Sequence, residues 1–252
     1  MTKHDKSGGI EIPGHTEEAS QRKAAKVAGL MFLFIVIGWT LNWTLIDSKL
    51  IVAGNVTATV NNIMANELLF RIGITNQLIF SISGVVLALA LYIILKPVNK
   101  NLALLALFLK LTEAILGAVI ALGSFIALLI LNGQASLTAF EQEYIQALVG
   151  LFLNGRISIS AIPMVFLGLN LMVFFYLLLK SKYIPGILAS FGILSYALIF
   201  MYALITILSP NYAAIMIIQI ISWAPSVIFE LIIGLWLLIK GVNVEQRDII
   251  NE

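Results

Sequence analysis

Hydrophobic residues occur in six long runs along this chain, and short polar stretches separate the runs. A helix rises about 1.5 Å per residue, so roughly 20 apolar residues cross the hydrocarbon core of a bilayer, which is about 30 Å thick. All six runs reach that length. We therefore predict an all-α polytopic membrane protein, a six-transmembrane-helix bundle whose spans are residues 24–46, 72–95, 102–131, 157–179, 185–208 and 213–239.

Two further segments have apolar residues at helical spacing but carry too many polar residues to span a membrane. In residues 56–68 the apolar side chains are interspersed with asparagines and a glutamate, which is typical of a helix lying in the membrane interface. The loop 132–156 has a similar pattern. Its Thr138 and Glu141 fit a capping box, and Asn154-Gly155 fits a helix stop. We predict two short amphipathic helices on the outer face of the bundle.

The composition agrees with membrane insertion and divides the chain into three parts. Hydrophobic residues make up 60% of the chain and charged residues 11%, against about 25% in a typical soluble domain. The mean hydropathy is +1.02. Residues 1–23 are polar and contain glycine and proline, so they bury too little apolar surface to become ordered. We predict a disordered tail over 1–23, a six-span membrane domain over 24–241 and a second tail over 242–252.

Lysine and arginine are distributed unequally between the two sides of the predicted bundle. The side that holds both tails carries eleven, whereas the opposite side carries three, namely Lys49, Arg71 and Arg156. Cytoplasmic loops of membrane proteins carry an excess of these residues. We therefore expect a multi-pass protein of the cell (cytoplasmic or inner) membrane, with both termini in the cytoplasm.

The residues present exclude several classes of function. The chain has no cysteine, and His4 and His15 lie in the amino-terminal tail, so the spans contain neither a thiolate nor an imidazole. A net charge of +2 is too small for a nucleic-acid surface. Signatures of metalloproteases, serine hydrolases and phosphate-binding loops are absent. We expect no cofactor, no metal site and no catalytic residue; an enzyme is not expected, although the sequence leaves that question open.

One group of charged residues lies deep within the predicted spans. Lys110 and Glu113 are in the run 102–131, and Glu230 is in the last run. The rise per residue places both glutamates roughly 15 Å from the cytoplasmic helix ends, near the midplane. An ionised side chain at such depth costs roughly 3 kcal/mol, so these residues must face other helices or water. We predict that Lys110, Glu113 and Glu230 form a buried polar cluster, a candidate ligand or ion site.

Three interpretations of this cluster stay open. If Lys110 pairs with one glutamate, the other lacks a cation and would hold a proton, as a proton-coupled carrier requires. Alternatively, Lys110 and Glu113 form a structural ion pair, or the long side chain of Lys110 lets its ammonium group reach the inner surface of the membrane. The third interpretation is an interface with a partner chain. Glu230 is the most informative of the three, because its own helix offers no residue of opposite charge.

Uncharged polar residues within the spans are secondary candidates: Gln219, Ser226, Asn76 and Gln77. Gln219 and Ser226 share a helical stripe with Glu230. For the amides, and for Asn170 in the fourth span, hydrogen bonding between helices is a better interpretation than contact with a substrate.

These features support two hypotheses about function. The first is a small carrier or binding protein for an ion or small solute, with Glu113 and Glu230 as gating or proton-linked groups. The second is a structural or regulatory membrane module that binds a partner protein or lipid without transport. Both hypotheses require the lipid bilayer as a partner, and the sequence does not indicate an oligomeric state.

Five groups of residues also carry a family resemblance: Asn66–Arg71, Leu91–Lys96 with 99–105, Leu111–Glu113, Tyr183–Leu188 and Phe229–Gly241. In order and spacing they resemble a bacterial integral-membrane family described as domain of unknown function 4386, over residues 24–241. The resemblance implies a bacterial cytoplasmic-membrane protein without an established activity, so no residue role carries over. Arginine often stands in that family where this chain has Lys110, which argues against a mechanism in which the lysine loses its proton.

Overall fold

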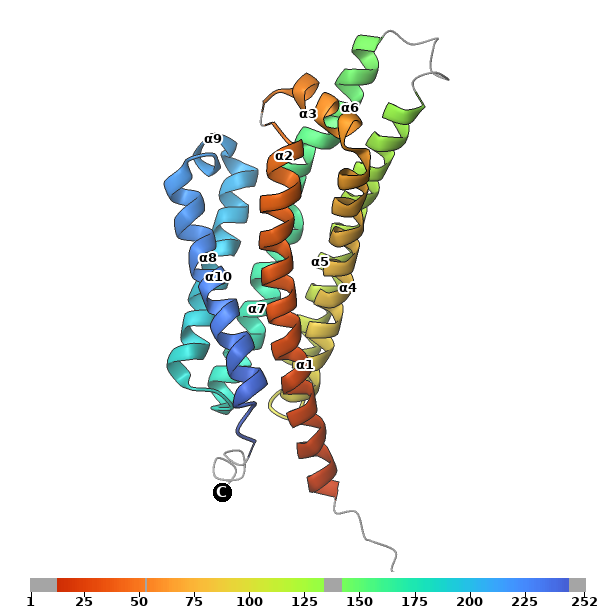
Figure 1. The fold of residues 1–252 in the computed structure, drawn as a ribbon. Coiled ribbons are helices and arrows are strands. Elements are labelled where there is room, and N and C mark those ends of the chain that lie inside the picture. The colour runs from red at the N-terminus through yellow and green to blue at the C-terminus, as the bar shows by residue number, and fades with distance from the viewer. Residues whose placement is uncertain (1–12, 53, 134–141, 245–252) are drawn as a thin grey trace, which may run out of the picture.

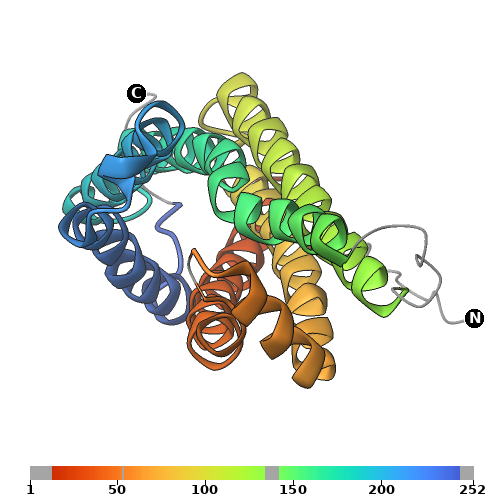
Figure 2. The same cartoon turned by 90° about the horizontal axis from the view of Figure 1, so that it is seen from above.

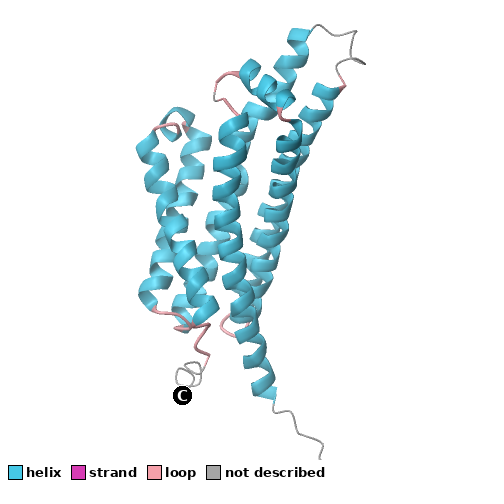
Figure 3. Cartoon of the chain, viewed as in Figure 1, coloured by secondary structure: helices cyan, strands magenta, loops and turns pink. Residues whose placement is uncertain are grey.

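The structure, a computed structural model, describes residues 13–52, 54–133 and 142–244. Within these ranges, six helical segments are long and apolar enough to cross a membrane. The first is built from α1 (Pro13–Asn42), a short π-helix η1 (Trp43–Asp47) and α2 (Ser48–Leu50); the others are α4 (Glu67–Leu95), α5 (Lys100–Asn132), α7 (Ala161–Ser181), α8 (Gly186–Leu208) and α10 (Met216–Ile239). Figure 3 shows that helices account for nearly all of the described chain, which contains no strand. The prediction of an all-α, six-span bundle is confirmed.

The six spans form a closed ring in chain order. Each span packs on the next, from α1 through α4, α5, α7 and α8 to α10, and α10 returns to pack on α1. Figure 2 shows this arrangement end-on. Inward-pointing side chains of spans that are far apart in the sequence, such as α5 and α10, can therefore meet in the middle.

Three shorter helices lie at one end of the ring, opposite the end that carries the carboxyl terminus (Figure 1). α3 (Val56–Ala65) packs on α6 (Gln142–Ile159), and α9 (Pro210–Ala213) joins α8 to α10. Asn55 caps α3, because its Oδ1 accepts a hydrogen bond from the backbone N–H of Ala58 at 2.9 Å. Val60 and Ile63 bury one side of that helix. We call this end of the bundle the α3 end and the opposite end the terminal end.

The structure corrects two predicted boundaries. Residues 13–23, predicted to lie in a disordered tail, form the first turns of α1. Gln21 is buried there and donates from Nε2 to the backbone carbonyl of Ile94 on α4 at 2.8 Å, a contact that helps to offset the entropy of ordering. The predicted helix stop at Asn154-Gly155 is also wrong, because α6 continues to Ile159. Residues 1–12 and the Thr138–Glu141 capping box lie outside the described residues.

The start of the predicted carboxyl-terminal tail is likewise ordered. Val242 and Val244 are buried, and the backbone N–H of Asn243 donates to the carbonyl of Tyr183 at 3.0 Å. The chain therefore turns back across the terminal end of the bundle after α10. Residues 245–252 lie outside the described ranges.

Two apolar cores hold the ring together, and they lie at different depths. The larger core lies toward the terminal end and is rich in aromatic rings, including Phe32, Phe175, Tyr196 and Phe229. The smaller core lies at the α3 end and joins residues of η1, α2, α3, α4, α5 and α6. On the outward sides of the spans many large apolar side chains are exposed, as contact with lipid requires.

Candidate functional site

An ion pair on α5 forms the first part of a buried polar group. Lys110 donates from Nζ to Glu113 Oε1 at 2.6 Å, and the two side chains are 8% and 17% exposed. A spacing of three residues puts both on one helix face. Along α5 the pair lies between Ala106 of the larger core and Ala121 of the smaller one. Both charges are therefore sheltered by the protein, as their depth in the membrane demands.

A second helix, α7, contributes the fully buried Asn170. Its Nδ2 donates to Glu113 Oε2 at 2.9 Å and to the backbone carbonyl of Phe166 at 2.6 Å. If Nδ2 and Oδ1 were exchanged, the amide oxygen would face the carboxylate of Glu113 and the carbonyl of Phe166, which are both acceptors. These contacts therefore determine the orientation of the amide. Asn170 Oδ1 is then buried without a hydrogen-bond partner among the described residues. Such an acceptor costs about 1–3 kcal/mol as long as no donor reaches it.

Two further spans contribute a tyrosine and a glutamate. Tyr196 of α8 donates from its hydroxyl to Glu230 Oε1 of α10 at 2.7 Å. The tyrosine ring is 1% exposed and stacks on Phe175 of α7, with ring centroids 5.8 Å apart and planes 6° apart. Phe229 meets both rings edge-on. This aromatic packing fixes the position of the Tyr196 ring, and its hydroxyl is thereby held within hydrogen-bond distance of Glu230.

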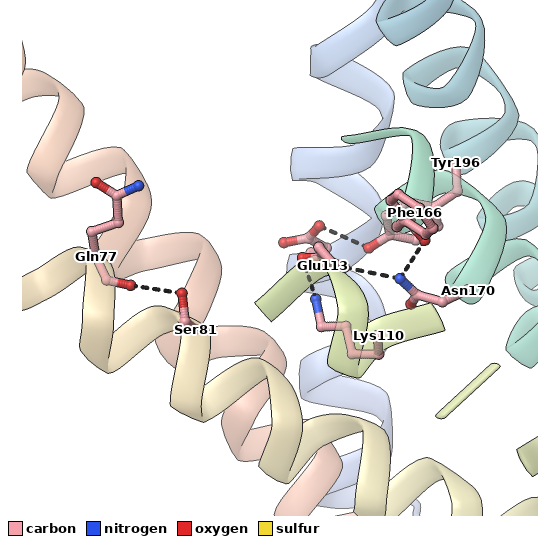
Figure 4. A network of polar contacts seen from close by, with 8 residues as sticks. Gln77, Ser81, Lys110, Glu113, Phe166, Asn170 and Tyr196 are labelled. Carbon is pink, nitrogen blue, oxygen red and sulfur yellow. Dashed lines mark hydrogen bonds and ion pairs between the residues drawn. The ribbon is translucent and has the colours of Figure 1, made fainter. Parts of the chain in front are cut away.

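The two parts form one cluster, because Glu230 interacts electrostatically with both Lys110 and Glu113. Figure 4 shows Lys110, Glu113, Asn170 and Tyr196 close together between the helices. On α4, Gly84 makes room for the lysine, since a Cβ there would lie 2.8 Å from Lys110 Cε. We define the polar centre as Lys110, Glu113, Asn170, Tyr196 and Glu230.

The charges of the polar centre do not balance. When all three ionisable groups of the predicted cluster are charged, two carboxylates share one ammonium, which leaves one negative charge in excess. In a low dielectric an uncompensated charge is costly, so a proton or a bound cationic group would stabilise the site. The arrangement is chemically suited to take up and release such a charge. Its role as a ligand or ion site stays a prediction.

The hydrogen bonds of the four secondary candidates join them to residues outside the polar centre. Asn76 Nδ2 donates to Asn42 Oδ1 of α1 at 3.1 Å, and Gln77 Nε2 donates to the Gly117 carbonyl of α5 at 3.4 Å. Figure 4 shows Gln77 well separated from Lys110. Gln219 Nε2 donates to the Ala213 carbonyl at 3.1 Å, and Ser226 Oγ donates to the Trp223 carbonyl of its own helix at 2.9 Å. Three of these four side chains thus bond to a neighbouring helix.

Sequence reasoning did not select Tyr196 and Gly84, and it interpreted Asn170 only as a link between helices. A tyrosine or glycine within an apolar run gives no pattern of its own, because its partner is on another span. Two cavities, of about 280 and 270 Å³, lie at the terminal end, and no residue of the polar centre lines either of them. In the described ranges, no group of three or more His, Cys, Asp or Glu residues is arranged to hold a metal ion.

Comparison with known proteins gives a family but no activity. No curated protein and no solved structure matches the chain. The family model of a domain of unknown function, DUF4386, matches residues 27–241, which include the whole polar centre, five of the six spans in full and most of the first, which begins at Glu17. The chain therefore belongs to the DUF4386 family.

Proposed function

We propose that this protein is a small membrane carrier or binding protein for an ion or small solute, and that the polar centre is its binding site. One observation supports this above others: the Lys110–Glu113 ion pair and the Tyr196–Glu230 hydrogen bond lie beside Asn170 Oδ1, which is buried and has no hydrogen-bond partner among the described residues. A proton-bearing cation such as ammonium would supply both the missing charge and the missing donor. A bare monovalent cation would be coordinated by the same oxygens.

The position of the centre supports the proposal further. It is built from four spans of one ring and adjoins the larger apolar core, of which Tyr196 is a member, so small movements of these spans change its surroundings. Binding sites near the midplane between spans are typical of carriers. We propose that both termini face the cytoplasm of a cell membrane, so that the terminal end is the inner end of the bundle. The excess of lysine and arginine at that end supports this orientation.

Proton movement and cation binding test the proposal directly. In the first assay, full-length protein is placed in liposomes loaded with the pH-sensitive dye pyranine, and a potassium diffusion potential is applied to drive proton movement. In the second assay, unfolding of the protein in detergent is measured in the presence of lithium, sodium, potassium or ammonium chloride. We expect proton movement or cation-dependent stabilisation in the parent protein. The variants Glu113→Gln and Glu230→Gln should lose it. Glu67→Gln is the matched control, because Glu67 pairs with Arg71 at the start of α4, outside the polar centre.

The second hypothesis, a structural or regulatory module that binds a partner protein or lipid, has one observation in its favour. No residue of the polar centre lines either of the two cavities at the terminal end. If folded parent protein and folded Glu230→Gln behave alike in both assays, the centre is a structural ion pair and this second hypothesis replaces the first.

A further inference from the structure

The contact between α1 and α10 is tight at one level of the bundle and is lost toward the α3 end. A Cβ on Gly234 would lie 2.7 Å from Leu33 Cγ and 3.2 Å from the carbonyl oxygen of Gly29, so the two helices touch there. Figure 1 shows α1 and α10 close together toward the terminal end and farther apart toward the α3 end. The exposure of the residues that continue each contact face shows where the helices separate.

On α10, three large apolar side chains continue the face that carries Gly234. Counted toward the α3 end, Val227, Trp223 and Ile220 follow at intervals of seven, four and three residues, so they share that face. Their side chains are 37%, 38% and 47% exposed. The same side of α10 that is covered at Gly234 is therefore uncovered in the half of the helix nearer the α3 end.

The facing side of α1 shows the same change. Ile37 and Thr40 follow Leu33 by four and seven residues and so lie on its face. Ile37 is 49% exposed, and Thr40 is exposed as well. Beyond the level of Leu33 and Gly234, neither helix covers the other. We call the uncovered residues of the two faces the open seam: Ile37, Thr40, Ile220, Trp223 and Val227.

The first half of α10 is held by α8 and α9 instead of α1. Trp223 meets Tyr202 of α8 edge-on, with ring centroids 6.2 Å apart, and Gln219 donates to the Ala213 carbonyl of α9 at 3.1 Å. Pro225 separates this half from the contact with α1; it has no N–H to donate within the helix, and a proline at such a position favours a bend. The two halves of α10 thus have different neighbours, so the separation from α1 is built into the ring.

Glu230 of the polar centre lies where the open seam begins. It precedes Gly234 by about one helical turn and is half-buried. Its hydrogen bond from the Tyr196 hydroxyl brings no positive charge. The open seam beyond it is apolar except for Thr40, whose Oγ1 donates to the Val36 carbonyl of its own helix at 2.8 Å. A carboxylate at the base of an apolar surface matches a cation that carries an apolar chain.

We propose that the polar centre binds a primary alkylammonium ion, with the ammonium group at Glu230 and the alkyl chain along the open seam. This inference rests on the function proposed above and names the class of its ligand. The ammonium group supplies charge and hydrogen-bond donors to the carboxylate. The alkyl chain covers Val227 and Trp223, and each methylene that it buries adds to the affinity.

Ligand-dependent stabilisation of the full-length protein in detergent tests this inference with three small probes. Ammonium has the charge without the chain, butan-1-ol has the chain without the charge, and butylammonium has both. We expect half-maximal stabilisation at an about 10-fold lower concentration of butylammonium than of ammonium. Butan-1-ol should give no saturable stabilisation, and Glu230→Gln should abolish the response to both cations.

Variants of α10 separate the effect of the chain from that of the charge. Val227→Trp places a bulky ring in the open seam and should bring the potency ratio of butylammonium to ammonium from about 10 close to one. Ile228→Trp is the matched control, because the neighbouring position points about 100° away around the helix and is 52% exposed, and it should keep the ratio. Circular dichroism verifies folding; if Val227→Trp fails to fold, Thr40→Trp on the facing helix takes its place.

The outcomes distinguish this inference from the proposed function. Equal potency of the two cations would overturn the alkylammonium ligand and leave a cation site at the polar centre. Equal stabilisation by butan-1-ol and butylammonium would show that the open seam accepts any apolar chain, as it would accept bilayer lipid, and would also overturn the inference. If neither cation stabilises the folded parent protein, this inference and the proposed cation site fail together.

Discussion

At the level of single residues, the hydroxyl of Tyr196 on α8 hydrogen-bonds to Glu230 and so connects it to a neighbouring span. Glu230 has no cation on its own helix, and its short hydrogen bond at 2.7 Å comes from α8. The ring of Tyr196 has little freedom to move, because Phe175 and Phe229 pack against it. The hydroxyl therefore acts at a defined position, and removing it changes one contact with little change in packing.

We expect Tyr196→Phe to lower the free energy of unfolding by about 1–2 kcal/mol, because the half-buried carboxylate of Glu230 loses its hydrogen-bond donor. Thermal or denaturant unfolding in detergent measures the effect. Tyr176→Phe is the control, since Tyr176 is 49% exposed, and its effect should stay within about 0.5 kcal/mol. In a Glu230→Gln background the loss caused by Tyr196→Phe should shrink; an unchanged loss would show that the hydroxyl acts through packing alone.

At the level of helices, the contact that closes the ring depends on two glycines. A Cβ on Gly29 of α1 would lie 2.7 Å from the Gly234 carbonyl oxygen and 2.8 Å from the Leu238 nitrogen, both backbone atoms of α10. Backbone atoms do not yield as a flexible side chain does. The two helices can therefore approach this closely only if small residues occupy the contact.

We expect Gly29→Ala to destabilise the protein by about 1–3 kcal/mol, because α1 and α10 must separate to admit the methyl group. The control is Gly123→Ala, where a Cβ would lie 3.5 Å from the Phe152 Cδ1, an ordinary contact. Alanine there should be neutral or stabilising by up to about 1 kcal/mol, since glycine weakens a helix interior. Equal melting temperatures for the two variants would contradict the importance of the close approach.

At the level of the whole molecule, the ring has two chemically different ends. Lysines and arginines are concentrated at the terminal end, which also holds both cavities, whereas α3, α6 and α9 cover the opposite end. An even number of spans returns the chain to the side from which it started. The orientation in the membrane is thus a property of the whole bundle.

Because the chain has no cysteine, single cysteines can report this orientation. Asn211 of α9 and Lys180 at the end of α7 are both exposed, at opposite ends of the bundle. With the termini in the cytoplasm, a membrane-impermeant maleimide added to intact cells should label Asn211→Cys. Lys180→Cys should react only after lysis. The reverse pattern would show that the orientation is inverted, and the parent chain supplies the unlabelled control.

The sequence alone determined the six spans, because the cost of placing polar backbone and side chains in hydrocarbon depends on run length and composition. It also indicated that Lys110, Glu113 and Glu230 need shelter, since an ion at the midplane is costly on any fold. Ordering of residues 13–23 and continuation of α6 past Asn154-Gly155 depended instead on contacts with other helices. Gln21, for example, finds its acceptor 73 positions away.

Only the tertiary structure decided which side chains join the charged residues. Asn170 is 57 positions from its partner Glu113 in the sequence, and Tyr196 is 34 positions from its partner Glu230. Nothing in the helices of Asn170 and Tyr196 specifies those partners. The cavity lined by Tyr183 likewise includes residues 241–243, which reach it because the chain turns back after α10. Hydrophobic run length is a local property and can be read along the chain, whereas the pairing of a donor with an acceptor depends on which helix faces are brought together when the ring closes.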